Sequence, residues 1–150
     1  MTVTFLAVGA LTGWLGYRAL QIHEEQAHQR LFVDTARRAA LNLTTIGYAD
    51  AQADVQRIID SSTGRFRDDF QKRVKPFIDA VKQSRSTSVG TVTEAGLESA
   101  TDGHAQVLVA VSIDITNGGG GHQDPRTWRM RLGIEQTETG PKVSDVAFVP

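Results

Sequence analysis

The sequence predicts an α+β fold, in which an N-terminal transmembrane helix is followed by helices packed on a four-stranded antiparallel curved sheet. Three observations lead to this prediction. Residues 1–17 are largely apolar and contain no charged side chain, the middle of the chain repeats apolar residues at helical spacing, and the last third alternates them at the spacing of strands. Helices first and strands second are typical of an α+β domain rather than of alternating α/β units.

The first segment is predicted to be a membrane anchor over residues 1–22. A helix of about 17 residues spans roughly 25 Å, and extension to Ile22 supplies the remaining width of a hydrocarbon core. Arg18 can then reach the interface. A cleaved signal peptide fits less well, because no charged residue precedes the apolar stretch and no small-residue cleavage site follows it. The apolar side chains expected to hold the anchor are Phe5, Leu6, Leu11, Trp14, Leu15 and Tyr17.

Charge near the anchor leaves its orientation open. Arg18 and Arg30 follow the apolar stretch and only the terminal amino group precedes it, which weakly favours a cytoplasmic C-terminal domain. A start at Met1 that is internal to a longer chain, with a more basic N-terminal segment, would reverse this bias.

A long helix is expected from Arg18 to about Leu43, since this stretch contains neither glycine nor proline. Its polar part suggests a stalk. The predicted organisation is therefore an anchor over 1–22, a helical stalk over 23–43 and a soluble α+β domain over 44–150.

Two further helices are predicted before the sheet. The first carries Val55, Ile58 and Ile59 on one face and ends near Ser61. The second is strongly amphipathic, and Pro76 within it predicts a kink or two consecutive helices. Its apolar stripe is interpreted as core that packs against the sheet, in preference to a partner-binding or membrane-surface helix. The stripe consists of Phe66, Phe70, Val74, Phe77, Ile78 and Val81.

Four strands follow, and three of them show alternation of apolar and polar residues. Thr-rich sequence around Val89, Val92 and Leu97 marks the first strand. The second has Val107, Val109, Val111, Ile113 and Ile115 on one face, and the third has Trp128, Met130, Leu132 and Ile134. The last contains Val143, Val146 and Phe148, where the step of three predicts a bulge.

The predicted turns indicate a meander. Asp102-Gly103 is a hairpin signal, residues 117–121 form a glycine-rich loop, and Gly140-Pro141 is expected to make the last turn. A strict two-residue turn at Asp102-Gly103 would set Leu97 opposite Leu108, on the wrong face of the sheet. We therefore expect a register shift in this hairpin.

The composition argues against several classes of function. Sixteen basic and 17 acidic residues leave no excess charge for a nucleic acid, and the absence of cysteine excludes thiol chemistry. The glycine run lacks the lysine of a phosphate loop. The four histidines fall at helical spacings or turns that do not favour a metal site. We expect no catalytic residues, no metal and no cofactor, and the protein is interpreted as a non-enzyme.

Several phrases, taken together, resemble the Mce-associated membrane proteins of mycobacteria and related actinobacteria, which accompany the Mce lipid importers. The resemblance spans nearly the whole chain. Besides the N-terminal apolar helix, it rests on Asp54–Asp60, Thr63–Gly64, Phe66–Phe70, Ser88–Val92, Ala105–Val111, Trp128–Met130 and Val146–Pro150.

The resemblance implies a single-pass protein of the plasma membrane whose domain is extracytoplasmic and looks like a cystatin/NTF2-type cone. It implies an accessory or stabilising subunit that contacts Mce transporter subunits, with membrane lipid around its anchor. A lipid-binding or lipid-transfer module is the alternative, with an apolar pocket in the cone. The residues expected to form this pocket, or the core, are Phe66, Phe70, Phe77, Val109, Val111, Trp128, Met130 and Phe148.

Overall fold

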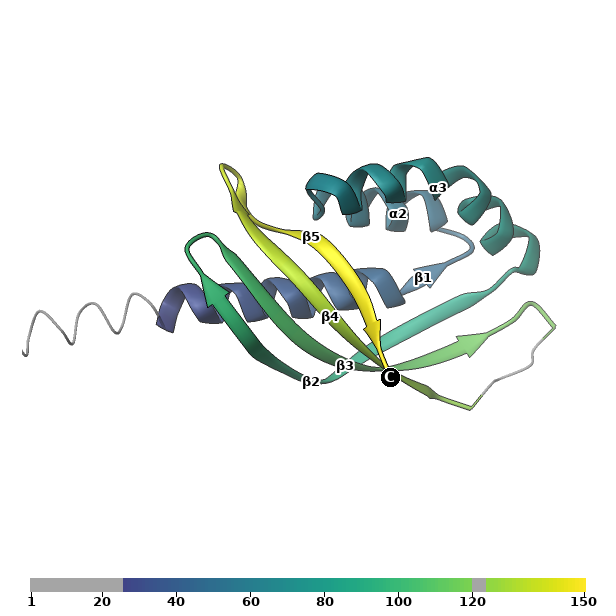
Figure 1. The fold of residues 1–150 in the computed structure, drawn as a ribbon. Helices are drawn as coiled ribbons and strands as arrows, with labels where there is room; N and C mark the ends of the chain where they lie inside the picture. The colour runs from purple at the N-terminus through teal and green to yellow at the C-terminus, as the bar shows by residue number, and fades with distance from the viewer. Residues whose placement is uncertain (1–25, 120–123) are drawn as a thin grey trace, which may run out of the picture.

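The computed structural model describes residues 26–119 and 124–150. Figure 1 shows a curved antiparallel sheet crossed on one face by a long helix, with two further helices side by side at one edge. The predicted anchor over 1–22, including the six apolar residues expected to hold it, lies outside the described residues. Among the helices that are described, none has the length and apolarity needed to cross a membrane.

The sheet has five strands in the order β1-β2-β3-β4-β5, and all neighbours are antiparallel. The strands are β1 (Ile46–Gly47), β2 (Thr87–Thr101), β3 (His104–Thr116), β4 (Arg126–Thr137) and β5 (Gly140–Val149). The prediction of an antiparallel α+β meander is confirmed, and the short β1 is an additional strand. Two residues give no alternation that sequence reasoning could detect, which explains why β1 was not predicted.

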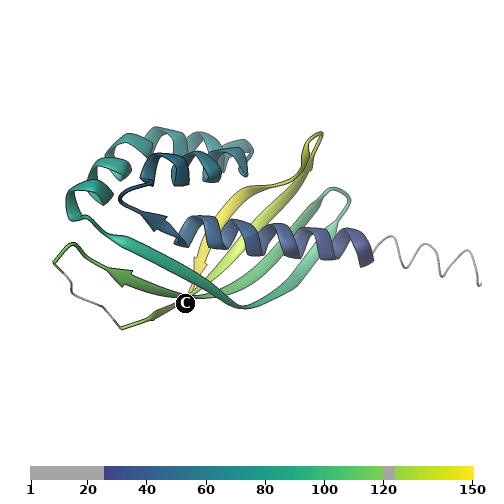
Figure 2. The same ribbon diagram turned by 180° about the vertical axis from the view of Figure 1, so that it is seen from behind.

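The core lies between the sheet and the N-terminal helix, which runs through residues 26–44 and crosses the sheet (Figures 1 and 2). The helix buries Phe32 and three alanines, Ala36, Ala39 and Ala40. Alanines at this spacing allow the helix backbone to approach the sheet closely. The inward side chains of the strands complete the core: Val107, Val109, Val111, Ile113, Met130, Leu132, Ile134 and Val143.

This arrangement corrects the interpretation of the stripe of residues 66–81 as core packed against the sheet, since of that stripe only Phe66 packs against the buried cluster. That stripe lies on α3 (Gly64–Ser84), which has no fully buried residue. The N-terminal helix occupies the expected place instead. The small alanines of the N-terminal helix give it weak hydrophobic periodicity in the sequence, whereas three phenylalanines make the periodicity of α3 strong.

The other two described helices pack against each other, the first contacting β1 and the second, α3, contacting β5. The predicted helix with Val55, Ile58 and Ile59 on one face is confirmed as α2 (Ala51–Asp60), and all three residues are buried. Pro76 was expected to give a kink or two consecutive helices, and the second alternative is wrong, because α3 is one helix. Pro76 is exposed, so water can reach the carbonyl that lost its backbone donor.

The register of the sheet agrees with most of the sequence pattern. Leu97 lies opposite Val107, through register shifts on either side of it, which confirms the expected shift. The bulge predicted in the last strand is also confirmed, between Val143 and Asp145. The predicted Gly140-Pro141 turn is wrong: Thr137 pairs with Gly140, so the turn lies two residues earlier.

Two contacts connect the helical half to the sheet. The carboxylate of Asp54 accepts a hydrogen bond from the Gly47 N–H at 2.8 Å and pairs with Arg57 at 2.7 Å. The side chain of Thr44 lies directly over Gly90, where any Cβ would collide with it. The ends of the N-terminal helix and of β1 are thereby fixed against their neighbours.

Candidate functional site

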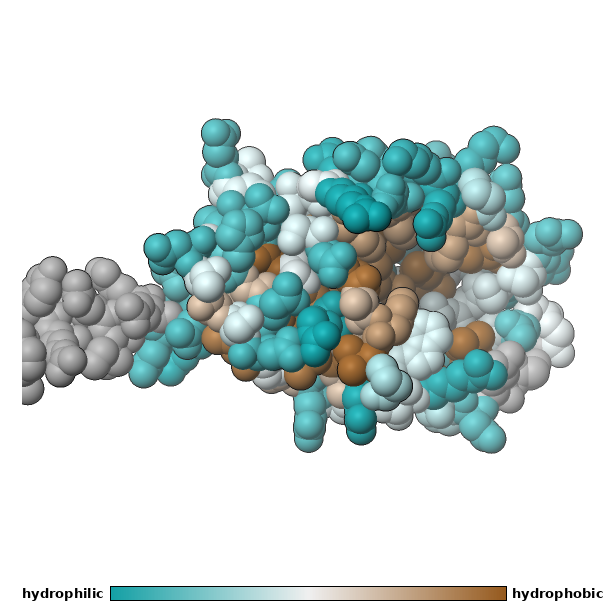
Figure 3. All heavy atoms as spheres, viewed as in Figure 1, coloured by the Kyte–Doolittle hydropathy of each residue, from teal (hydrophilic) through white to brown (hydrophobic). Residues whose placement is uncertain are grey.

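An apolar groove lies between α3, the N-terminal half of β4 and the C-terminal half of β5. Its volume is about 500 Å³. Figure 3 shows the brown apolar surface in a hollow below the hydrophilic outer face of α3. The lining residues are Leu43, Thr44, Arg65, Phe66, Asp69, Phe70, Arg73, Trp128, Met130, Asp145, Val146 and Phe148. We call this the α3–β5 groove.

One wall is a row of aromatic rings on α3. Phe66 and Phe70 stack with ring centroids 5.9 Å apart, and Phe77 continues the row 6.4 Å from Phe70. These residues recur at steps of four and seven, which places them on one side of a helix. Each of them is only half-buried, so the apolar stripe of α3 is incompletely covered by the described residues.

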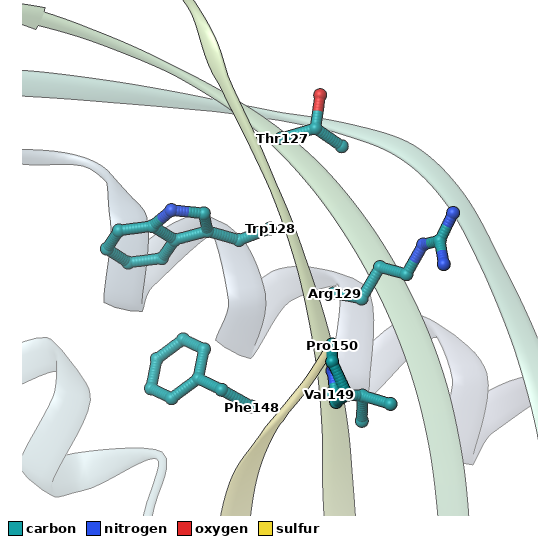
Figure 4. Close-up of a pocket in the computed structure, with 6 residues that line it drawn as sticks. All are labelled: Thr127, Trp128, Arg129, Phe148, Val149 and Pro150. Carbon is teal, nitrogen blue, oxygen red and sulfur yellow. The ribbon is translucent and has the colours of Figure 1, made fainter.

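The opposite wall carries Trp128 and Phe148 from adjacent strands. Their rings meet edge to face, with centroids 5.4 Å apart and planes at 87°. Both side chains extend to one side of the sheet, whereas Arg129 and Val149 extend to the other (Figure 4). Trp128 is 40% exposed and Phe148 is 65% exposed. An aromatic pair with this exposure is unusual away from a binding surface.

Charged residues of α3 form the rim of the groove. Arg65, Asp69 and Arg73 lie at successive steps of four, in a row next to Phe66 and Phe70. Asp69 pairs with Lys72 at 3.1 Å and with Arg65 at 3.5 Å. The hydrogen bond from Lys72 is the largest cause that lowers the pKa of the Asp69 carboxyl. Among the described residues, Arg73 has no carboxylate within ion-pair distance.

The structure separates seven of the eight predicted pocket or core residues into two groups. Val109, Val111 and Met130 are buried in the core, and Met130 also contributes to the floor of the groove. Four others come together in the groove: Phe66, Phe70, Trp128 and Phe148. Phe77 contacts Phe70 but does not line the groove.

The rim residues Arg65, Asp69 and Arg73 were missed as site residues in the sequence. The stripe predicted from the sequence contains only apolar residues, so these charged residues lay outside it. Their spacing of four, one position before Phe66 and Phe70, is the signal that could have found them. Leu43 was missed for a different reason, because its position at the end of the N-terminal helix gives no indication that it meets α3.

The groove offers apolar contact and peripheral charge rather than reactive groups. Its carboxylates, Asp69 and Asp145, lie on opposite walls. The carboxylate of Asp69 already forms ion pairs with basic residues of its own helix. Among residues 26–119 and 124–150, no three His, Asp or Glu side chains are grouped to hold a metal ion. Such a surface is suited to binding apolar side chains or an apolar ligand.

The whole chain, residues 1–150, matches a family model described as "Uncharacterized protein Rv1363c/MT1408-like". The chain belongs to this family. It is 37% identical over 153 residues to the uncharacterized protein Rv1363c of Mycobacterium tuberculosis strain H37Rv. The match covers 100% of the chain and 59% of that relative, so the chain spans little more than half of the relative's length. Association with Mce transporters, which the sequence resemblance implied, is not part of this family description.

Solved structures with low sequence identity share the fold of this Rv1363c/MT1408-like chain. An IcmL-like type IV secretion system protein of Legionella pneumophila superposes with a TM-score of 0.65 at 15% identity, over 79% of this chain and 89% of that one. The periplasmic domain of DotI gives 0.62 at 17% identity, over 79% and 92%. At these identities the likeness shows the fold alone, and it supports the predicted NTF2-like arrangement of a curved sheet with helices.

Proposed function

We propose that this protein is a non-enzymatic, membrane-anchored accessory subunit that acts through protein–protein contacts made by the α3–β5 groove. The observation that carries the proposal is the aromatic lining of the groove. The core is already complete between the sheet and the N-terminal helix, yet Trp128 and Phe148 remain 40% and 65% exposed. Exposed aromatic residues of this kind are typical of interface centres.

The location belongs to the same proposal. Residues 1–22 form the anchor, 23–43 lead from it into the domain, where the helix of residues 26–44 already packs on the sheet, and the domain through residue 150 lies on the extracytoplasmic side of the plasma membrane. The uncharged residues 1–17 support the anchor. The fold shared with the periplasmic domain of DotI supports the extracytoplasmic side by analogy. In Figure 1 the described chain enters the domain at the end opposite to the last turn of α3.

The partner proposed is a subunit of an Mce-type lipid importer. Support for this finer assignment comes from the sequence phrases that resemble Mce-associated proteins, among them Phe66–Phe70 and Val146–Pro150. Both phrases lie in the walls of the groove. The resemblance and the exposed aromatic surface therefore concern the same part of the molecule.

Site-specific photo-cross-linking in the native membrane tests this function. A photoreactive amino acid replaces Phe148 in the groove, and a matched variant carries it at Val89, which is 49% exposed on β2 and does not line the groove. We expect position 148 to cross-link to a transporter subunit and position 89 to give no such product. Equal products from both positions, or none from position 148, would contradict a docking role.

A lipid-binding module is the second candidate, favoured by the volume of about 500 Å³ and the apolar lining of the groove. The same cross-linking experiment distinguishes it. A lipid adduct at position 148, without a protein adduct, would replace the accessory-subunit proposal by lipid carriage.

A further inference from the structure

The two edges of the sheet differ in how far they are protected against pairing with another strand. At the β2 edge, β1 pairs with Thr87 and Ser88 only. The rest of β2 contains two register shifts and the exposed carboxylates of Glu94 and Glu98. Bulges and charges are devices that prevent another strand from pairing with an edge. The β2 edge is therefore protected.

At the β5 edge, the chain itself begins a sixth strand and then leaves it. Val143 donates to the Ser61 carbonyl at 2.9 Å, and its own carbonyl accepts from the Thr63 N–H at 2.8 Å. Ser62 and Val143 thus form an isolated parallel bridge. At the next residue, Gly64, a positive φ of 54° turns the chain into α3. Ser61–Thr63 therefore cover the β5 edge at Val143 and no further along the strand.

Beyond Val143 the outer edge of β5 is free of backbone partners among the described residues. The bulge and the proline of this strand lie in its first half, at Ser144 and Pro141. Residues Val146–Val149 contain neither device and no charged side chain. A regular, apolar, unpaired edge of this kind is a template for another extended chain.

The free edge adjoins the α3–β5 groove. Val146 and Phe148 both line it, so a strand added to β5 would lie beside Phe148 and toward α3. Side chains alternate across a strand. Every second side chain of an added segment would therefore enter the groove, between Phe148 and the phenylalanines of α3.

The charge of α3 indicates which other side chains an occupant of the groove would carry beside its apolar ones. Helix α3 carries six basic residues against three acidic ones. Arg65 and Lys72 share the single carboxylate of Asp69, and Arg73 has no ion-pair partner in the described part of the chain. An occupant of the groove therefore meets a basic helix, and acidic side chains would complement it.

We propose that the free edge of β5, from Val146 to Val149, is a docking site for an extended acidic–apolar segment of the protein partner, which adds to the sheet as a sixth strand. This rests on the proposed function and specifies the mode of contact. A helical segment would make its backbone hydrogen bonds internally and leave the N–H and C=O groups of the β5 edge unpaired. An extended segment forms hydrogen bonds with these groups and also places side chains in the groove.

Peptide display on the full-length chain in phosphatidylcholine nanodiscs tests the proposal. Random peptides of about ten residues are long enough to form one strand of ordinary length. We expect enrichment of peptides with apolar residues at every second position and acidic residues between them. Synthetic copies should slow amide hydrogen exchange at Val146–Val149. Their affinity should fall about tenfold or more for Phe148→Ala and for Arg73→Glu, and remain unchanged for the matched control Val89→Ala.

Three results would overturn the proposal. Enriched peptides with apolar residues at steps of three and four would indicate a helix. Binding without slower exchange in β5, or no enrichment at all, would exclude the edge as the site. Cross-linking of a photoreactive phosphatidylglycerol to the groove, with displacement of the peptide, would make a lipid the occupant. In the first two cases a protein cross-link from position 148 in native membranes would still support docking, so failure of the strand proposal is distinguishable from failure of the proposed function.

Discussion

Phe148 packs edge to face against Trp128 at 5.4 Å while 65% of its own surface stays exposed. Its neighbour in the sheet register, Met130, is 1% exposed and belongs to the core. Two paired residues on adjacent strands therefore differ sharply, because Met130 lies in the packed core and Phe148 lies in the open groove.

This contrast predicts different stability costs along the sheet. Phe148→Ala should lower the free energy of unfolding by less than about 1 kcal/mol, because most of the ring is already in water. Leu132→Ala, at a position with no exposure, should cost about 2–5 kcal/mol through loss of burial and a cavity. Chemical denaturation of the two variants in parallel measures the difference. Similar large costs for both would mean that Phe148 is a structural residue.

The contact between Gly90 and Thr44 predicts a glycine requirement at one position of β2. Gly90→Ala places a methyl group against the Thr44 side chain and should cost about 1–3 kcal/mol. Gly96→Ala is the matched control on the same strand, since nothing lies within 4 Å of its added Cβ. We expect that variant to unfold within about 0.5 kcal/mol of the original. Equal thermal stability of the two variants would contradict the close approach of the N-terminal helix to β2.

Asp54 is predicted to be a structural carboxylate of α2. Its side chain is buried and accepts the hydrogen bond of the Gly47 N–H. Asp54→Ala should therefore cost about 1–3 kcal/mol, because that N–H loses its partner. Asp60→Ala removes an exposed carboxylate from the same helix and should change the free energy of unfolding by no more than about 0.5 kcal/mol. Urea denaturation of both variants tests the assignment.

The ion pair between Arg131 and Glu98 predicts sensitivity to acid. Two hydrogen bonds of 2.6 and 2.8 Å from Arg131 lower the pKa of the Glu98 carboxyl. Because the folded pKa lies below the unfolded value, this contribution to stability is complete above the ordinary glutamate pKa of about 4.3 and is lost as pH falls through the folded pKa. An NMR titration of the Glu98 carboxyl should show a lowered midpoint, and Arg131→Met should return it toward the ordinary value. An unchanged midpoint in that variant would contradict the assigned cause.

The strands were predictable because their information is local. The alternation of Val107, Val109, Val111 and Ile113 fixes both the strand and its buried face. The register of Leu97 against Val107 followed from requiring both to share that face.

The choice of core helix was not predictable in the same way. Hydrophobic periodicity measures how apolar one side of a helix is, and Phe66 and Phe70 dominate that measure on α3. It does not show that Ala36, Ala39 and Ala40 fit against the sheet because they are small. The groove depended on the same tertiary information: its aromatic residues were named from the sequence, but their division between core and open surface required the arrangement of three helices around the sheet.

Accessibility of single cysteines tests the central claim, that a protein partner covers the α3–β5 groove in the membrane. The chain contains no cysteine, so Phe148→Cys and Val89→Cys can each report one position with a membrane-impermeant maleimide. We predict that Val89→Cys reacts in intact cells, as an extracytoplasmic domain requires, and that Phe148→Cys reacts only after purification removes its partner. Equal reaction of Phe148→Cys in cells and in purified protein would contradict a covered groove, and the account of docking with it.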